Sequence, residues 1–207
     1  FDFAPMVQHT WAYAPMCQDV LGMRHSKLSI NVDSGSKDNP DDPPTSKRET
    51  YDLESSDEIW AESNGVTFPE ILEVVSKATE ALQQEANRMG AGTGEVEELG
   101  AALNALPKQV QKKRLVAMHN NILTSLLADV TSRNLDRYFA VEEDFATQST
   151  ATAVRECEEL INLDKGTVLD KTRALLCLFL AKPDAPEINR LAESLARVLL
   201  LFSRRTF

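Results

Sequence analysis

Residues 107–145 read PKQVQKKRLVAMHNNILTSLLADVTSRNLDRYFAVEEDF and contain the longest uninterrupted helical pattern of the chain. Apolar residues recur there every three to five positions, which predicts an amphipathic helix with one buried face. We expect this buried stripe to consist of Val110, Leu115, Met118, Ile122, Leu126 and Val130, widened by Leu123 and Leu127. Pro107 lacks an N–H group, so it either opens this helix or kinks a longer helix that begins near Glu95.

The composition is that of a folded, acidic protein. The chain has 207 residues, 43% of them hydrophobic, and a formal net charge of -10. Such a charge disfavours the neutralisation of phosphates, so we expect no nucleic-acid partner. The longest apolar run, residues 174–181, is far shorter than the ~20 residues that span a bilayer, so we expect at most peripheral membrane contact.

The cysteines indicate where the protein is located in the cell, and the chain ends indicate whether it is part of a larger protein. Cys17, Cys157 and Cys177 are odd in number and far apart, which favours reduced thiols and a cytoplasmic location. The chain begins at Phe1 without Met and stops at Phe207 just after an apolar run. We therefore expect an excised piece of a larger protein.

The remaining patterns predict a mainly α, multi-helix fold with a small β-hairpin near the N-terminus. Alternating apolar residues predict strands in a β-hairpin at residues 27–53, interrupted by a flexible polar loop at residues 33–48. Three capping boxes, which begin at Ser55, Thr67 and Thr167, predict helix starts. Further helices are predicted at residues 68–89, 95–106, 152–163, 167–181 and from 187 onward, with residues 167–181 the most buried.

No catalytic, metal or cofactor site is predicted. The three histidines are not part of any metal-binding or nucleophile motif. We interpret His119 as a packing residue with a hydrogen-bond partner, and the acidic run at residues 142–144 as a solvated face. The glycines at residues 90–94 lack the Lys-Ser/Thr of a phosphate loop, which favours a flexible helical-hairpin tip. What remains is a helical surface for binding other helices.

Several segments together resemble one family. Residues 106–144, together with HTWAYAPMCQDVLG at 9–22 and LDKTRALLCLFLAK at 169–182, are similar to segments of the Sec-one/Munc-eighteen (SM) family, which organises SNAREs for membrane fusion. The words YDL and DEIW at 51–53 and 57–60 fit the same order. HTWAY, TFPE and KKRLVAMHNNI look most like the Sly-one branch, which serves transport between endoplasmic reticulum and Golgi.

The resemblance implies a domain organisation and a function. Residues 1–8 would be the end of domain 2, and residues 9–207 would be the helical domain 3a with a protruding helical hairpin. That hairpin would template SNARE assembly for vesicle docking and fusion, with syntaxin-type Qa-SNARE and R-SNARE helices as partners. Pro107 would be the hinge between bent and extended forms. The protein would be cytoplasmic and peripherally associated with ER and Golgi membranes.

A SNARE site needs exposed apolar anchors and flanking charge, because SNARE motifs are amphipathic helices. The candidate residues are the anchors Leu99, Leu103, Leu106 and Val110, and the basic rim Lys108, Lys112, Lys113 and Arg114. Alternatively, the leucines pack the helical hairpin on itself, and the cations are solvated or touch anionic lipid. A helical scaffold or tether without SNARE affinity stays open as a function, as does an enzyme that uses the glycine-rich tip for phosphate.

Overall fold

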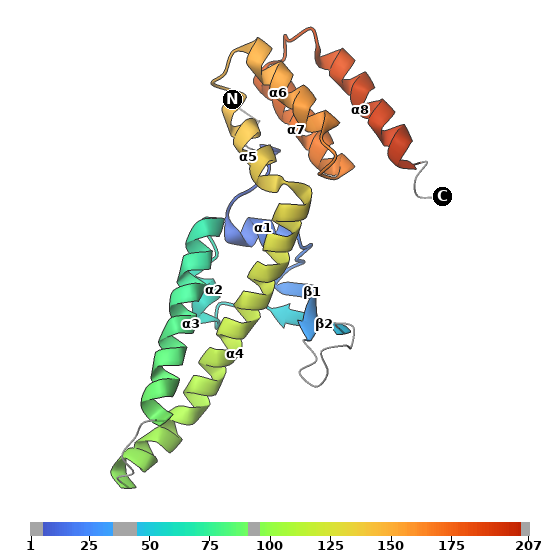
Figure 1. Cartoon of the computed structure of the whole chain (residues 1–207). Helices are drawn as coiled ribbons and strands as arrows, with labels where there is room; N and C mark the ends of the chain where they lie inside the picture. The colour runs from blue at the N-terminus through green and yellow to red at the C-terminus, as the bar shows by residue number, and fades with distance from the viewer. Residues whose placement is uncertain (1–5, 35–44, 91–95, 204–207) are drawn as a thin grey trace. The chain divides into compact units, whose positions relative to one another are not determined.

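The computed structural model describes residues 6–34, 45–90 and 96–203, and within these it confirms a mainly α fold with a small β-hairpin near the N-terminus (Figure 1). The side chains of residues 33–34, 45, 89–90, 96–106 and 198–203 lie outside the described part. The chain divides into two compact units. We call residues 11–127 the N-terminal unit, and residues 1–10 with 128–207 the C-terminal unit, and describe each by itself.

The N-terminal unit opens with a short helix and an antiparallel pair of strands. Helix α1 (Tyr13–Asp19) is followed by β1 (Lys27–Ser34) and β2 (Thr45–Asp52). The strands are longer than expected, so the predicted loop at residues 33–48 was too long at both ends. Backbone pairing in a ladder does not require apolar side chains, which is why polar residues such as Lys47 continue β2.

Two long helices form a helical hairpin in the same unit. After α2 (Glu58–Ser63), helix α3 (Phe68–Gly90) and helix α4 (Val96–Arg133) run antiparallel, side by side (Figure 1). The amide of Gln109 donates to Glu85 over 2.8 Å, and that of Asn120 donates to Thr79 over 3.3 Å. The predicted glycine-rich tip falls mostly in residues 91–95, outside the described residues.

Pro107 lies inside α4, and the helix continues through it. The two alternatives left by the sequence are therefore decided in favour of one long helix that begins near residue 95. Because proline has no N–H group, the carbonyl four residues earlier lacks its usual helical hydrogen bond at this point. Near Pro107, helix α4 is therefore held together by the backbone hydrogen bonds of the turns before and after it.

The buried stripe of α4 differs in part from the prediction. Ile122, Leu123, Leu126 and Val130 are buried as expected, and Val116 joins them. Leu115 and Met118 are half-buried. Val110 and Leu127 were predicted to be buried but are 63% and 49% exposed. Helical periodicity identifies a face, but it does not identify how far along that face neighbouring elements reach.

The C-terminal unit contains the last turn of α4 and four further helices. These are α5 (Leu135–Asp144), α6 (Thr150–Asn162), α7 (Val168–Ala181) and α8 (Ile188–Ser203). Asn134 joins α4 to α5 in the left-handed conformation, with φ of 62°. The main core combines residues of α6, α7 and α8 and of the loops beside them: Phe145, Ala153, Val154, Cys157, Ile161, Leu175, Cys177, Leu178, Ala185, Leu191 and Leu195.

Helix α7 is less buried than its composition predicted. Leu169 is 63% exposed and Phe179 is 45% exposed, while Lys171 is buried. The Lys171 ammonium donates to the carbonyl oxygens of Ile161 and Leu163, at the end of α6. A buried lysine is stable there because backbone carbonyls replace the water around its charge.

Two of the three predicted capping boxes begin helices. Thr167 and Asp170 form the complete box at α7, and the Glu70 carboxylate accepts from the backbone N–H of Thr67 at α3. The box predicted at Ser55 is wrong, because Asp57 is the N-cap of α2 and accepts from the N–H groups of residues 59 and 60. An aspartate two positions later competes well as a cap, since its carboxylate is the stronger acceptor.

All three cysteines are free and buried. Burial raises the pKa of Cys17, Cys157 and Cys177 to about 12, because it disfavours the thiolate. Among the described residues, no helix is long and apolar enough to cross a membrane.

Candidate partner-binding surface on α4

The predicted basic rim lies on the surface. Lys108, Lys112, Lys113 and Arg114 are exposed on the turns of α4 that follow Pro107, and Pro107 itself is exposed. Val110, in the middle of these cations, is also exposed. The apolar candidates Leu99, Leu103 and Leu106 belong to the helix, but their side chains lie outside the described residues.

Val110 begins a row of positions that faces away from the core. At about 100° per residue, positions 110, 114, 117, 121 and 124 fall on one side of an unbroken helix. Val110, Arg114, Ala117 and Thr124 are exposed, and Asn121 is half-buried. The same row continues upstream to positions 106, 103 and 99, because each step is again three or four residues. The sequence pattern alone assigned Val110 to the buried stripe, which the exposure of this row corrects.

The four cations divide between two sides of α4. By the same helical geometry, Lys113 and Arg114 flank Val110 within about 60°, whereas Lys108 and Lys112 project from the opposite side. The predicted rim is therefore brought together only in part. Lys113 and Arg114 border the apolar row directly, and the other two cations broaden the positive surface around the helix.

A buried chain of hydrogen bonds holds α4 against α1 and α2. Tyr13 lies 2.7 Å from the Nδ1 atom of His119, and the Nε2 atom of His119 lies 2.8 Å from Asp57. This confirms the interpretation of His119 as a partnered packing residue. Burial lowers the pKa of His119 despite the neighbouring Asp57 carboxylate, so the imidazole is neutral and donates from Nε2. The burial of Tyr13 raises its pKa, which keeps the phenol as a donor to Nδ1.

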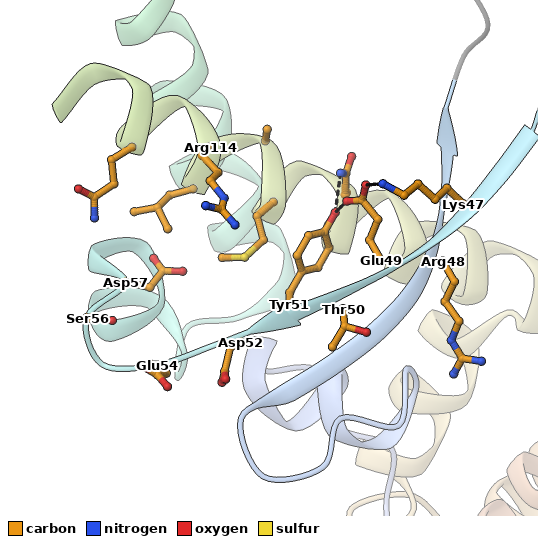
Figure 2. Close-up of a pocket in the computed structure, with 15 residues that line it drawn as sticks. Lys47, Arg48, Glu49, Thr50, Tyr51, Asp52, Glu54, Ser56, Asp57 and Arg114 are labelled. Atoms are coloured by element: carbon orange, nitrogen blue, oxygen red, sulfur yellow. Dashed lines mark hydrogen bonds and ion pairs between the residues drawn. The ribbon is translucent and has the colours of Figure 1, made fainter. Parts of the chain in front are cut away.

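A groove of about 890 Å³ lies beside the exposed row, between α4 and β2 (Figure 2). Leu115 and Met118 of α4 and Tyr51 of β2 contribute its apolar surface. The Tyr51 hydroxyl donates to Glu49 over 2.7 Å and accepts from the Asn121 amide over 2.9 Å. The sequence reasoning did not identify this groove, because its lining comes from segments about 60 residues apart.

The C-terminal unit contains a second buried polar network, which the sequence did not predict. Glu142 is buried, although the acidic run was expected to be solvated, and it accepts from both the backbone N–H and the Nδ1 atom of His9. The Nε2 atom of His9 lies 3.1 Å from Asp170, which also accepts from Arg133. Burial alone would lower the pKa of His9, but its hydrogen bonds to the two carboxylates raise it.

This network is an ion-paired core and not a catalytic arrangement open to substrate. Burial alone would raise the pKa of Asp170, but hydrogen bonds from His9, Arg133 and Thr167 hold it well below its usual range. Charges of both signs therefore compensate one another inside the unit. Within the described ranges, no group of three or more His, Cys, Asp or Glu residues is arranged to hold a metal ion.

Comparison with known proteins decides the family. Residues 1–202 match the model of the Sec1 family. The chain belongs to the Sec1 family. Human Sec1 family domain-containing protein 1 is 30% identical in an alignment 208 positions long, which covers 89% of this chain and 32% of that protein. Protein SLY1 of Saccharomyces cerevisiae is 30% identical in an alignment 195 positions long, which covers 86% of this chain and 29% of that protein. The chain thus spans about a third of the length of these Sec1 family relatives.

Solved structures of Sec1 family proteins agree with this assignment. Sly1p in complex with an N-terminal peptide of Sed5p matches 94% of this chain and 29% of that chain, with a TM-score of 0.68 and 26% identity. The SM protein Vps45 in complex with the Qa SNARE Tlg2 matches 94% of this chain and 33% of that chain, with a TM-score of 0.72. At 16% identity, the likeness to Vps45 shows the fold alone. The predicted resemblance to the SM family and its Sly-one branch is confirmed.

Proposed function

We propose that this chain is a SNARE-binding domain of an SM protein and that the exposed row of α4 receives a SNARE helix. The anchors would be Leu99, Leu103, Leu106 and Val110, flanked by Lys113 and Arg114, with Lys108 and Lys112 on the other side of the helix. Residues 9–207 would correspond to domain 3a, and residues 1–8 to the end of domain 2. In the whole protein, this domain would template the assembly of Qa-SNARE and R-SNARE helices before fusion.

The observation that carries the proposal is the exposure of Val110. This valine is 63% exposed, and the described positions Arg114, Ala117 and Thr124 of the same row are exposed as well. Helical spacing puts the three upstream leucines on this row. An amphipathic partner helix would bury this row through side chains spaced by three and four residues. The alternative is that Leu99, Leu103 and Leu106 pack the helical hairpin on itself. Val110, which is exposed, takes no part in such packing.

The surrounding charge supports a helical partner of opposite sign. The chain has a net charge of -10, yet four of the seven residues from Lys108 to Arg114 are cationic. A local positive surface in an acidic protein directs a partner to that surface and repels it elsewhere. The likeness to SLY1 and to the solved structure of Sly1p supports the vesicle-transport setting, and we extend to this chain a role in transport between ER and Golgi, with peripheral membrane association.

The test is the binding of purified SNARE motifs to the whole chain and to surface variants. We expect Val110→Asp to weaken the binding of a Qa-SNARE or an R-SNARE motif about tenfold, because a charge is placed in an apolar contact worth about 1.4 kcal/mol. Lys112→Glu and Lys113→Glu should weaken binding less and make it less sensitive to salt. The matched control is Lys77→Glu, which makes the same charge change at an exposed residue of α3.

Each outcome has a consequence for the proposal. Full-strength binding by Val110→Asp, with an unchanged circular dichroism spectrum, would remove the site from α4. A chain that binds neither SNARE motif would favour the scaffold or tether function. Weakening by Lys113→Glu but not by Lys112→Glu would place the partner on the side of α4 that carries Val110.

A further inference from the structure

Lys108 and Lys112 do not border the row that would receive a SNARE helix. Both are exposed, and they project from the side of α4 opposite Val110. Arg88, in the last turn of α3, is exposed as well. No described carboxylate forms an ion pair with any of these three cations. Their charges are therefore available to a partner.

The three cations lie at nearly the same level of the helical hairpin. The bond between Gln109 and Glu85 brings these two residues of the antiparallel helices side by side. Arg88 and Lys108 follow toward the tip by three residues and one residue, and Lys112 lies three residues away in the other direction. At a rise of about 1.5 Å per residue, the three cations span about 9 Å along the hairpin.

They also share one side of the hairpin. Leu72 of α3 and Thr124 of α4 line a groove that opens on the other side. At about 100° per residue, Arg88 lies about 160° from Leu72 around α3, and Lys108 lies about 160° from Thr124 around α4. Lys112 lies about 120° from Thr124. None of the three cations lines this groove or the groove beside β2.

Carboxylates are scarce near these cations. Residues 99–128 contain no Asp or Glu, although the whole chain has 32 in 207 residues. Glu85 lies among the three cations, and its carboxylate accepts from the Gln109 amide. Glu98 precedes Lys108 by ten residues, about 15 Å of helix rise, which exceeds the screening length of about 8 Å at physiological salt.

The carboxylates of the neighbouring elements lie nearer to other residues. Asp57, at the start of α2, is bound to His119, which is seven residues and about 10 Å of helix rise beyond Lys112. Arg114 does not belong with the three cations, because it borders the groove beside β2, which has a mixed lining. The carboxylates in that lining are Glu49, Asp52, Glu54 and Asp57.

The end of the hairpin that carries the cations is accessible. In Figure 1, the last turns of α3 and the first turns of α4 extend beyond α2 and the two strands. A charged surface on the outside of two projecting helices can approach a broad, flat partner. A peptide, in contrast, is usually bound in a groove or at a strand edge.

We propose that Arg88, Lys108 and Lys112 form a membrane-facing patch, at which the hairpin contacts the phosphate groups of an anionic lipid bilayer. This inference rests on the peripheral membrane association in the proposed function and assigns that contact to a surface. A bilayer with anionic lipids attracts the patch, while the net charge of -10 keeps the rest of the chain away from it. Because Val110 lies on the opposite side of α4, the bilayer and a SNARE helix can be bound together.

The test is co-sedimentation of the whole chain with vesicles that contain no SNARE. One set consists of phosphatidylcholine alone, and the other also contains about 30% phosphatidylserine. We expect binding to the anionic vesicles to be at least about tenfold tighter than to the neutral ones. Most of this binding should be lost when the salt concentration rises from about 0.1 M to about 1 M, because the screening length falls from about 10 Å to about 3 Å.

Variants test the patch itself. Lys112→Gln should weaken binding to anionic vesicles about fivefold, and together with Lys108→Gln about 25-fold, since each cation near an anionic surface contributes about a factor of five. Lys112→Arg keeps the charge and should bind as the original chain does. The matched control is Lys47→Gln, which removes one charge at a residue of β2 that is 71% exposed and should stay within about twofold.

Three results would overturn the proposal. Equal binding to neutral and anionic vesicles would exclude recognition of lipid charge. Equal weakening by Lys47→Gln and Lys112→Gln would mean that only the net charge of the chain matters. A chain that binds a SNARE motif but no anionic vesicle would overturn the membrane patch alone, in favour of an acidic protein segment as the partner of these cations.

The same measurements keep this proposal separate from the SNARE site. A chain that binds anionic vesicles in a manner sensitive to Lys112→Gln, yet binds no SNARE motif, would support the patch and remove the SNARE function.

Discussion

The Nε2 atom of His119, within the long helix α4, lies 2.8 Å from the carboxylate of Asp57, whose other oxygen caps α2. One carboxylate thus satisfies a helix terminus and a buried imidazole at the same time. Tyr13 completes the arrangement from α1, so three helices of the N-terminal unit are joined through a few polar atoms.

We predict that Asp57→Ala lowers the free energy of unfolding of the N-terminal unit by about 2–4 kcal/mol, since it removes a cap and leaves a buried imidazole donor without an acceptor. Asp57→Asn keeps a capping oxygen and should cost clearly less. Urea unfolding followed by tryptophan fluorescence measures both, because Trp11 and Trp60, the only tryptophans, belong to this unit. Equal losses in the two variants would show that the cap contributes little and that the bond to His119 carries the effect, because the asparagine amide cannot accept from the Nε2–H group while its oxygen caps α2.

The two buried histidines predict opposite responses to pH. His119 has a lowered pKa in the folded state, so the unfolded chain takes up the proton first and stability of the N-terminal unit falls as the pH drops below about 6.5. His9 has a raised pKa, so its contribution to the C-terminal unit is complete below about 6.5 and is lost as the pH rises through the folded pKa.

Nuclear magnetic resonance titration of the two imidazoles in the folded chain checks this prediction, with hydrogen exchange at pH 5 and pH 8 reporting the stability of each unit. We expect His9 to titrate above His119. The opposite order would contradict the assignment of a charged His9 between two carboxylates.

We predict that Gly166→Ala destabilises the C-terminal unit by about 3 kcal/mol or more. Gly166 has a φ of +87°, and an added Cβ would lie 2.8 Å from ring carbons of Tyr138, which is fully buried. Gly22→Ala is the control for backbone strain alone, since its φ is +71° and no atom lies within 4 Å of the added Cβ. Similar thermal shifts in the two variants would rule out the contact with Tyr138 as the main cause.

We predict that Pro107→Ala strengthens α4 locally, because it restores a backbone donor and removes the ring from the preceding turn, a change worth up to about 3 kcal/mol in a helix interior. Hydrogen exchange of amides at residues 103–111 should slow. Pro69→Ala is the control, since Pro69 is the second residue of α3, where a helix needs no backbone donor. Unchanged exchange around residue 107 would mean that neighbouring turns already hold α4 fully.

The sequence predicted the secondary structure well and the polar contacts only in part. The period of α4, the start of α3 at Thr67 and the capping box of α7 follow from local spacing, which is visible in one segment. The pairing of His9 with Glu142 joins residues 133 positions apart, and no local pattern indicates it. The expectation that His119 has a partner was correct, but the identity of that partner depends on where α2 lies.

In the candidate partner-binding surface, too, the sequence predicted some features correctly and left others undecided. Its cations were predicted to be exposed, and they are. Val110 was assigned both to the buried stripe and to the partner surface, because an apolar residue at helical spacing fits either assignment. Its exposure depends on which side of α4 the rest of the N-terminal unit covers, and this is a property of tertiary packing.

The burial of every native cysteine makes the chain selectively addressable by thiol chemistry. A maleimide reacts with an exposed thiolate, and none of the three native thiols offers one near neutral pH. A single cysteine introduced at an exposed position, such as V110C, would therefore carry a dye or spin label without prior removal of the native cysteines. Because the native cysteines would stay unlabelled, the signal would come from this one position of α4 and could be followed while a partner binds.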